Sequence, residues 1–186
     1  TRLRQSLNAE VPLQALFEQP TIAGLEAALE QYQDTVALPP VVPVPRSDQP
    51  LPLSFAQERL WFLAQLEADS AAYHISGAVQ VTGSLDTTAL TAAVSDLVQR
   101  HETLRTTFIS PEGQAIQQIH PQMAVPLTQL NEADLPLPLS QWLSQSAQQP
   151  FDLEAGPLLR LHLVHQSASS FVLAVTMHHI ISDGWS

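Results

Sequence analysis

The chain has 186 residues, and an apolar content of 45% with a mean hydropathy of +0.03 indicates a folded chain. A formal charge of −11, from 18 acidic and 7 basic residues, argues against nucleic acid and anionic membrane surfaces as partners. The absence of cysteine excludes disulfides, thiolate nucleophiles and cysteine-ligated zinc, and no apolar stretch approaches the roughly 20 residues that span a bilayer. We expect a cytoplasmic protein.

The first 32 residues are predicted to form the end of a small helical unit. Residues 11–17 make a short amphipathic turn that stops before Pro20, and Thr21 can cap a second helix. Two short helices cannot enclose a core by themselves, so we expect residues 1–32 to belong to a domain that begins upstream. Residues 33–52 follow as a linker, because six prolines within fourteen residues favour an extended, semi-rigid segment.

Residues 53–186 are predicted to form a second domain of the α+β class with a mixed sheet, because helices and hairpins are interspersed. A capping-box pair, Ser54 and Gln57, predicts one helix start, and Asp86 predicts another. Residues 121–138 are rich in proline and predict irregular structure. The remaining predicted elements are strands at Tyr73–Val81, Leu104–Ile109 and Gln114–Ile119, a helix at Leu139–Ala147, and a hairpin of Leu158–His165 with Phe171–His179.

The helix that starts after Ser54 carries apolar residues on more than one face, which predicts that it is deeply packed. Arg59 lies within that apolar surface. A buried arginine would need a partner, since an unpaired buried charge is costly. The alternative is that the Arg59 side chain extends to solvent.

The chemistry of the chain is expected near its last ten residues, where His178 and His179 follow an almost unbroken apolar run over residues 171–177. Such a run predicts a buried strand, and histidines at its end are either satisfied by backbone partners or catalytic. Because side chains alternate along a strand, the two rings should face opposite ways, one open to a cavity and one buried. A zinc site that adds His162 and His165 lacks suitable spacing and cysteine support, so we expect no metal.

Asp183 and Arg105 form a predicted ion pair. Asp183 follows the turn after the histidines, and Arg105 lies in the predicted strand Leu104–Ile109, where burial favours pairing. The alternative is an arginine that faces solvent. Neither a Gly-x-Ser-x-Gly motif nor a phosphate-binding glycine loop occurs, so esterase and nucleotide chemistry lack support.

Three ordered motifs of this chain resemble those of nonribosomal peptide synthetase condensation domains. They are Ser54–Leu63, Arg100–Phe108 and Met177–Ser186, the last of which matches His-His-x-x-x-Asp-Gly with a trailing Trp-Ser. The resemblance implies a fold similar to chloramphenicol acetyltransferase, with two lobes flanking a tunnel, of which residues 53–186 would supply the first. Residues 1–32 resemble the C-terminal end of a peptidyl carrier domain, whose phosphopantetheine-bearing serine would lie outside this chain.

The resemblance also implies a reaction and a set of site residues. The amine of an acceptor aminoacyl group attacks the donor thioester, and an amide bond forms between two carrier-bound substrates. His179 aligns with the catalytic histidine of the family, acting as a proton acceptor or as a positioning group, with His178 as support. Asp183 aligns with a structural aspartate paired with the arginine at Arg105, and Gly184 would permit the tight turn.

The implied partners are an upstream and a downstream carrier domain, each presenting its substrate on a phosphopantetheine arm, together with a second lobe and an adenylation domain in the same polypeptide. Epimerisation domains, which usually read Asp-Gly-Val-Ser-Trp, and heterocyclisation domains, which have a pair of aspartates, fit less well. Non-catalytic modules that recruit a partner enzyme typically lose the second histidine, whereas His179 is present. A free-standing acyltransferase is disfavoured by the carrier-like segment and the proline-rich linker.

Overall fold

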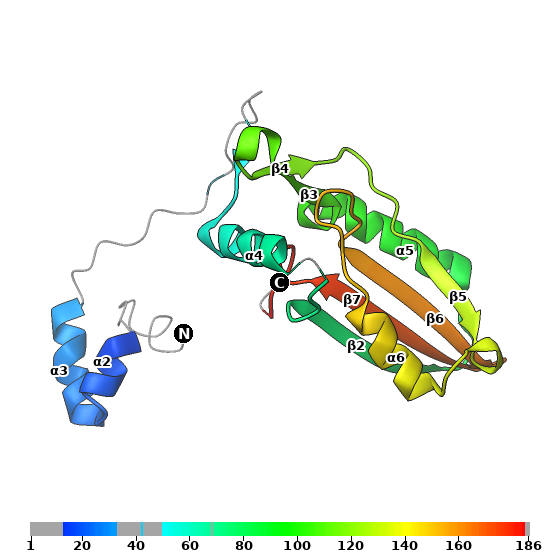
Figure 1. Cartoon of the computed structure of the whole chain (residues 1–186). Helices are drawn as coiled ribbons and strands as arrows, with labels where there is room; N and C mark the ends of the chain where they lie inside the picture. Colours follow the sequence, from blue (N-terminus) through cyan, green and yellow to red (C-terminus); the bar gives the residue numbers. More distant parts are fainter. Residues whose placement is uncertain (1–12, 33–41, 43–49, 68, 185–186) are drawn as a thin grey trace. The chain divides into compact units, whose positions relative to one another are not determined.

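The computed structural model describes residues 13–32, 42, 50–67 and 69–184, and the chain divides into two compact units, residues 1–46 and 47–186. In the first unit, α2 (Leu13–Glu18) is followed by α3 (Ile22–Tyr32) (Figure 1). The Thr21 hydroxyl accepts a hydrogen bond from the Gly24 N–H at 3.1 Å, so the predicted helix start is confirmed. Most of the predicted linker, residues 33–41 and 43–49, lies outside the described residues.

The second unit is built on a four-stranded sheet in the order β2-β7-β6-β5. Its β6–β7 hairpin, predicted from sequence, is confirmed, and β2 pairs antiparallel with β7 along its whole length. β5 pairs parallel with β6, so the sheet is mixed, as predicted. The strands are β2 (His74–Thr82), β5 (Leu127–Asn131), β6 (Leu159–Ser167) and β7 (Ser170–His178).

Strand β5 is absent from the sequence-based expectation, which has irregular structure over residues 121–138. The strand contains two leucines, Leu127 and Leu130, among polar residues and follows Pro126, so its local pattern is weak. Its pairing with β6 supplies the stability that this local pattern lacks.

A smaller three-stranded sheet has the order β1-β4-β3. Its strands are β1 (Leu51–Pro52), β3 (Thr106–Ile109) and β4 (Ile116–Ile119). The predicted pairing of β3 with β4 is confirmed, although β3 begins two residues later than expected. Residues 102–105 instead form a 3₁₀ turn, η1 (Glu102–Arg105), because the Thr106 hydroxyl donates to the Glu102 carbonyl at 2.7 Å and closes it. The expectation that Arg105 lies in a strand is therefore wrong.

Both predicted helix caps of the second unit are confirmed. At α4 (Phe55–Leu66), the Ser54 hydroxyl accepts from the Gln57 N–H at 3.3 Å, and the Gln57 side-chain oxygen accepts from the Ser54 N–H at 2.9 Å. At α5 (Thr87–Arg100), the Asp86 carboxylate accepts from two backbone N–H groups in the first turn. The predicted polar helix is α6 (Leu139–Gln148).

The hydrophobic core lies between α5 and one face of the large sheet. It includes buried side chains from α5, both sheets and the turn after β7. Helix α6 lies on the other face, where its Ser146 hydroxyl is 3.4 Å from the His162 ring of β6, and Figure 1 shows the two helices on opposite faces. The buried members of the core are Leu53, Val98, Phe108, Val125, Leu153, Leu158, Leu159, Leu161, Ile180 and Ile181.

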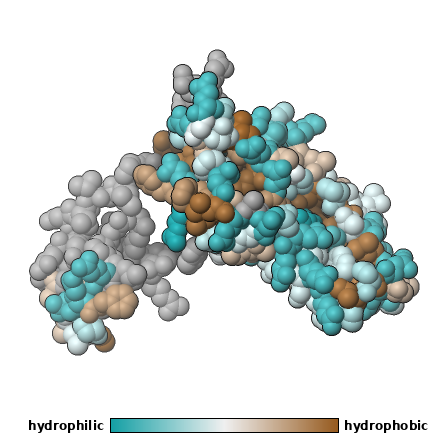
Figure 2. Space-filling view, in the orientation of Figure 1, coloured by the Kyte–Doolittle hydropathy of each residue, from teal (hydrophilic) through white to brown (hydrophobic). Residues whose placement is uncertain are grey.

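The prediction that α4 is deeply packed is wrong. None of its residues is buried, and Phe55, Phe62 and Leu66 are 92%, 57% and 66% exposed. One side of the helix packs on the core through Leu60, Trp61 and Ala64, while the opposite side, at helical spacing, faces solvent. Figure 2 shows this hydrophobic surface over α4. Arg59 is exposed on the same side, so the solvent-facing alternative holds for it.

Candidate active site

The end of strand β7 is held from both sides by backbone hydrogen bonds. The His178 N–H donates to the Leu158 carbonyl at 3.0 Å, next to β6. The His179 N–H donates to the Tyr73 carbonyl at 2.8 Å, next to β2. Because both partners adjoin strands of the same sheet, the backbone of the two histidines is held in a fixed position.

The two imidazole rings lie on opposite sides of this strand end. His178 is 4% exposed and lines a cavity of about 140 Å³ between the end of α4, residues 70–74 and Phe151. His179 is exposed and lines a different, wider cavity of about 550 Å³. The structure therefore separates the two rings in the way that strand alternation predicts.

His178 fixes the turn that follows it. Its Nδ1 accepts a hydrogen bond from the Ile180 N–H at 3.1 Å, so the ring proton of the neutral side chain is on Nε2. Burial, then the neighbouring His74 and His179, lowers the pKa of His178 to about 4. His178 is thus neutral near pH 7 and serves as a hydrogen-bond acceptor for the backbone of residues 178–181.

The cavity beside His179 draws its walls from segments that are far apart in sequence. Gln57 reaches across it, and its side-chain amide donates to the Ile180 carbonyl at 3.4 Å. Sequence reasoning assigns Gln57 a role in capping α4 alone, and its contact with the histidine turn is visible only in three dimensions. The lining residues include Ser54, Gln57, Tyr73, Thr103, His179 and Asp183.

Asp183 and Gly184 follow His179 in the chain. Asp183 lines the cavity and is exposed. Gly184 is also exposed; its φ is not in the left-handed region, and an added Cβ would meet no atom within 4 Å. The tight-turn role of Gly184 and the supporting role of Asp183 stay predictions.

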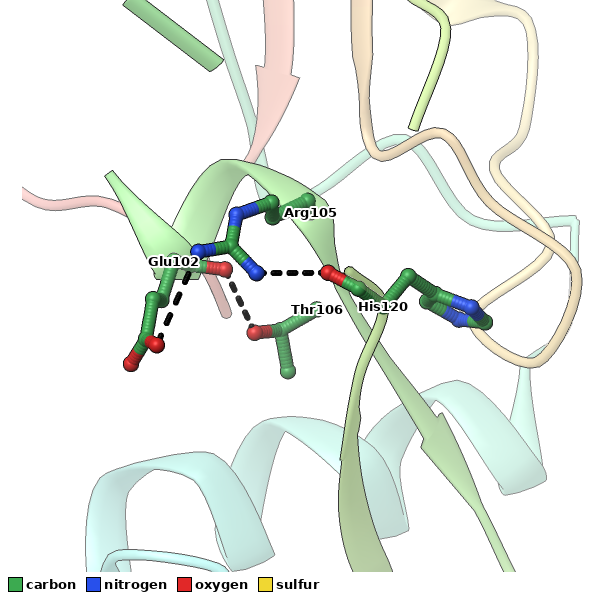
Figure 3. A network of polar contacts seen from close by, with 4 residues as sticks. All are labelled: Glu102, Arg105, Thr106 and His120. Atoms are coloured by element: carbon green, nitrogen blue, oxygen red, sulfur yellow. Dashed lines mark hydrogen bonds and ion pairs between the residues drawn. The ribbon is translucent and has the colours of Figure 1, made fainter. Parts of the chain in front are cut away.

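Arg105 lies in a polar network around η1 (Figure 3). Its Nη1 donates to the His120 carbonyl at 2.5 Å, and its Nη2 lies 3.6 Å from a carboxylate oxygen of Glu102. The Arg105 side chain is 11% exposed, and its Nε is buried without a hydrogen-bond partner. These contacts tie η1 to the end of β4, whereas the predicted pairing of Arg105 with Asp183 stays a prediction.

Replacing Arg105 with alanine is expected to lower the free energy of unfolding by about 1–3 kcal/mol, because a charge-assisted hydrogen bond to a partly buried carbonyl is lost. Urea denaturation of the two forms measures this difference. Arg100→Ala, which removes an exposed arginine at the end of α5, is the matched control. Equal stability of Arg105→Ala and the wild type would contradict a structural role for the network.

His74 is a site residue that sequence reasoning did not single out. It pairs directly across the sheet with His178, and the two ring centroids are 5.8 Å apart. The Nδ1 of His74 lies 2.8 Å from the Ala147 carbonyl oxygen in α6. The register of β2 against β7 brings these rings together, and the one local signal is a titratable residue at the start of a predicted strand.

The other histidines considered as metal ligands lie elsewhere on the sheet. His162 packs edge-on against Trp142 of α6, and His165 packs against Phe171 at the far end of β7. Within the described ranges, no three His, Cys, Asp or Glu side chains are grouped so that they could hold a metal ion. No helix in those ranges is both long and apolar enough to cross a bilayer.

The strand end with its two histidines lies within the part of the chain that a known family model matches. The family model of the condensation domain matches residues 47–186, and the chain belongs to this family. The chain is 38% identical over 191 residues to tyrocidine synthase 3 of Brevibacillus parabrevis, covering 100% of this chain and 3% of that protein. It is 40% identical over 190 residues to a dimodular nonribosomal peptide synthase of Bacillus subtilis (strain 168), covering 100% and 8%.

Solved structures agree with this assignment. The starter condensation domain of rhizomide synthetase RzmA matches with a TM-score of 0.67 and 27% identity, over 74% of this chain and 34% of that one. The X-domain in its complex with OxyB from teicoplanin biosynthesis matches with a TM-score of 0.67 and 36% identity, over 77% and 31%. The predicted fold class is confirmed. The chain thus spans about a third of the solved domains and a few per cent of the synthetases that it matches.

Proposed function

We propose that this chain supplies the histidine-bearing lobe of a condensation domain that joins two carrier-bound thioesters in nonribosomal peptide synthesis. The observation that carries the proposal is the position of His179. His179 lines a cavity of about 550 Å³, while its backbone N–H is held by the carbonyl of Tyr73, the residue before β2. A reactive imidazole with a fixed backbone and an accessible ring is what proton transfer or positioning in an acyl transfer requires.

In the proposed reaction, the acceptor amine attacks the donor thioester carbonyl and forms a tetrahedral intermediate. The new C–N bond is kept, the C–S bond breaks, and the donor's phosphopantetheine leaves as a thiol that takes up the proton released by the amine. His179 accepts that amine proton, or donates a hydrogen bond that orients the intermediate. Both roles use the nitrogens of the His179 ring, and neither requires His178.

The proposed partners are the carrier domains that deliver the two substrates, together with a second lobe and an adenylation domain in the same polypeptide. We assign residues 1–32 to the end of an upstream carrier domain, 33–52 to the linker and 53–186 to the lobe. The division of the chain into two compact units, near the middle of that linker, supports this arrangement. The phosphopantetheine arms are substrates carried by the partners, with no group resident in this chain.

A second candidate is a non-catalytic module that binds a partner enzyme. The structural match to an X-domain solved in complex with OxyB favours it. The exposed ring of His179 favours catalysis instead, because a recruitment surface has no need of an imidazole inside a cavity. An epimerisation domain is a further alternative within the family, and its product would be a changed stereocentre instead of a new amide bond.

A two-carrier assay tests the proposal and its architecture together. The complete parent domain, supplied with a donor and an acceptor loaded on their carriers, is expected to form the dipeptide. Residues 47–186 alone are expected to form none, because the solved domains extend well beyond the matched third. Mass spectrometry of the acceptor carrier detects the product. Dipeptide formation by the isolated lobe would contradict the architecture, and its absence with the complete domain would contradict the function.

A further inference from the structure

We propose that His74 is a positioning residue for the two histidines at the end of β7, an inference that rests on the proposed condensation function. His74 is the first residue of β2 and lies directly opposite His178 in the sheet. Its neighbour Tyr73 accepts the backbone hydrogen bond of His179. Tyr73 and His74, at the start of β2, thus contact two consecutive histidines at the end of β7, one through a carbonyl and one through a ring.

The His74 ring is fixed by contacts with three elements. Its Nδ1 donates to the Ala147 carbonyl near the end of α6 at 2.8 Å, because a carbonyl oxygen can only accept. The His74 and Phe151 rings form a T-shaped contact, with centroids 4.9 Å apart and planes inclined by 71°. On the remaining side, the His178 ring lies 5.8 Å away. Because the His74 ring is held in one orientation, it presents a single fixed surface against which the His178 ring packs.

The support for Phe151 comes from Arg160 of β6. The guanidinium carbon of Arg160 lies 4.4 Å from the centroid of the Phe151 ring. The same guanidinium donates to the carbonyls of Ser146, Gln149 and Pro150, at 3.1, 3.2 and 3.2 Å. It therefore joins the end of α6 to the aromatic group that contacts both His74 and His178.

The chain of contacts ends at the turn that carries His179. His74 sets the orientation of the His178 ring, and His178 Nδ1 accepts the N–H of Ile180. The Ile180 carbonyl also accepts a hydrogen bond from the Gln57 side-chain amide, and both residues line the cavity beside His179. A rotation of the His178 ring would break its hydrogen bond to the Ile180 N–H. Because Ile180 and His179 line the same cavity, the wall of that cavity would then shift. His74 would in this way affect His179 without contacting the substrate.

The second ring nitrogen of His74 also belongs to this arrangement. With Nδ1 bonded to Ala147, the Nε2 of His74 is buried and has no hydrogen-bond partner. Glu67 and Tyr73 line the cavity of about 140 Å³ that His74 shares with His178, and Arg160 lies beyond the Phe151 ring.

The experiment compares two substitutions of His74 in the complete parent protein. His74→Phe keeps an aromatic ring but removes the donor to Ala147, and His74→Asn keeps a donor near the position of Nδ1 but removes the ring. We expect His74→Phe to lower kcat for dipeptide formation by about 10- to 100-fold with little change in KM for the carriers, because misplacement of a reacting group acts on kcat. His74→Asn is expected to recover part of the loss.

A spectroscopic readout separates positioning from simple destabilisation. Because His74 contributes to the low pKa of His178, both substitutions are expected to raise the pKa of His178 in an NMR titration. His165→Phe, which removes a ring at the far end of the sheet, is the control and should keep the wild-type kcat and titration. If His74→Phe does not fold, His74→Asn carries the same test.

The outcomes distinguish this inference from the function on which it rests. A wild-type kcat and an unchanged His178 titration in both His74 variants would overturn the role of His74, even if His179 proves essential. A wild-type protein that forms no dipeptide would overturn the proposed function, and the NMR titration would still report whether His74 controls His178. A loss of kcat that His165→Phe shares would also count against a specific role for His74.

Discussion

Replacing His179 with alanine in the complete parent domain is expected to abolish dipeptide formation and to leave the fold intact. The ring is exposed in its cavity, and its backbone hydrogen bond to Tyr73 survives the substitution. Loss of a proton-transfer or positioning group typically lowers the rate by about 10²- to 10⁴-fold. Mass spectrometry of the acceptor carrier measures the product, and thermal melting tests the fold.

Two controls sharpen this experiment. His165→Ala removes a histidine from the far end of the sheet and should keep the wild-type rate. His179→Asn can still hydrogen bond but cannot take up a proton, so its residual rate separates positioning from general base catalysis. A near-normal dipeptide yield from His179→Ala would contradict the proposed role of this residue.

Acidification from pH 6.5 to pH 4 is expected to lower the free energy of unfolding through His178, by up to about 3 kcal/mol. The pKa of His178 falls from its ordinary value of 6.5 to about 4 in the folded state, mainly because the ring is buried. Over that range the unfolded chain binds a proton that the folded chain does not, so stability falls as pH falls. Well above pH 6.5 His178 is neutral in both states, and the effect disappears.

His178→Asn isolates this contribution. Asparagine does not titrate, and its side-chain oxygen can still accept the N–H two residues on, at Ile180. Urea denaturation at several pH values should therefore give a shallower slope for the variant than for the wild type. Some slope should persist, because burial also lowers the pKa of His162. Identical slopes would contradict a buried, neutral His178.

The features that sequence predicts best are those that depend on near neighbours. The caps at Ser54 and Asp86 were predictable because the residues that bond lie two or three positions apart. The separation of His178 and His179 followed from strand alternation alone. The three ordered motifs, Ser54–Leu63, Arg100–Phe108 and Met177–Ser186, together pointed to the family.

The features that sequence misses depend on what lies across the fold. Strand β5 has a weak pattern of its own and exists because β6 pairs with it. The contact of His74 with His178 requires the register of two strands about a hundred residues apart in sequence. The exposed side of α4 carries apolar residues such as Phe55 and Phe62, which are usually found in a core. Because both sides of this helix are apolar, the sequence does not show which side packs on the core.

The position of β2 at the edge of the large sheet affects how the isolated chain behaves in solution. β2 is nine residues long and pairs with β7 on one side, while no strand in the described part of the chain pairs with its other side. A long unpaired edge is a template for strand addition between molecules, and the apolar side of α4 adds to that tendency. The formal charge of −11 opposes self-association, so the isolated chain should aggregate most readily at high salt and near its pI of about 4.8.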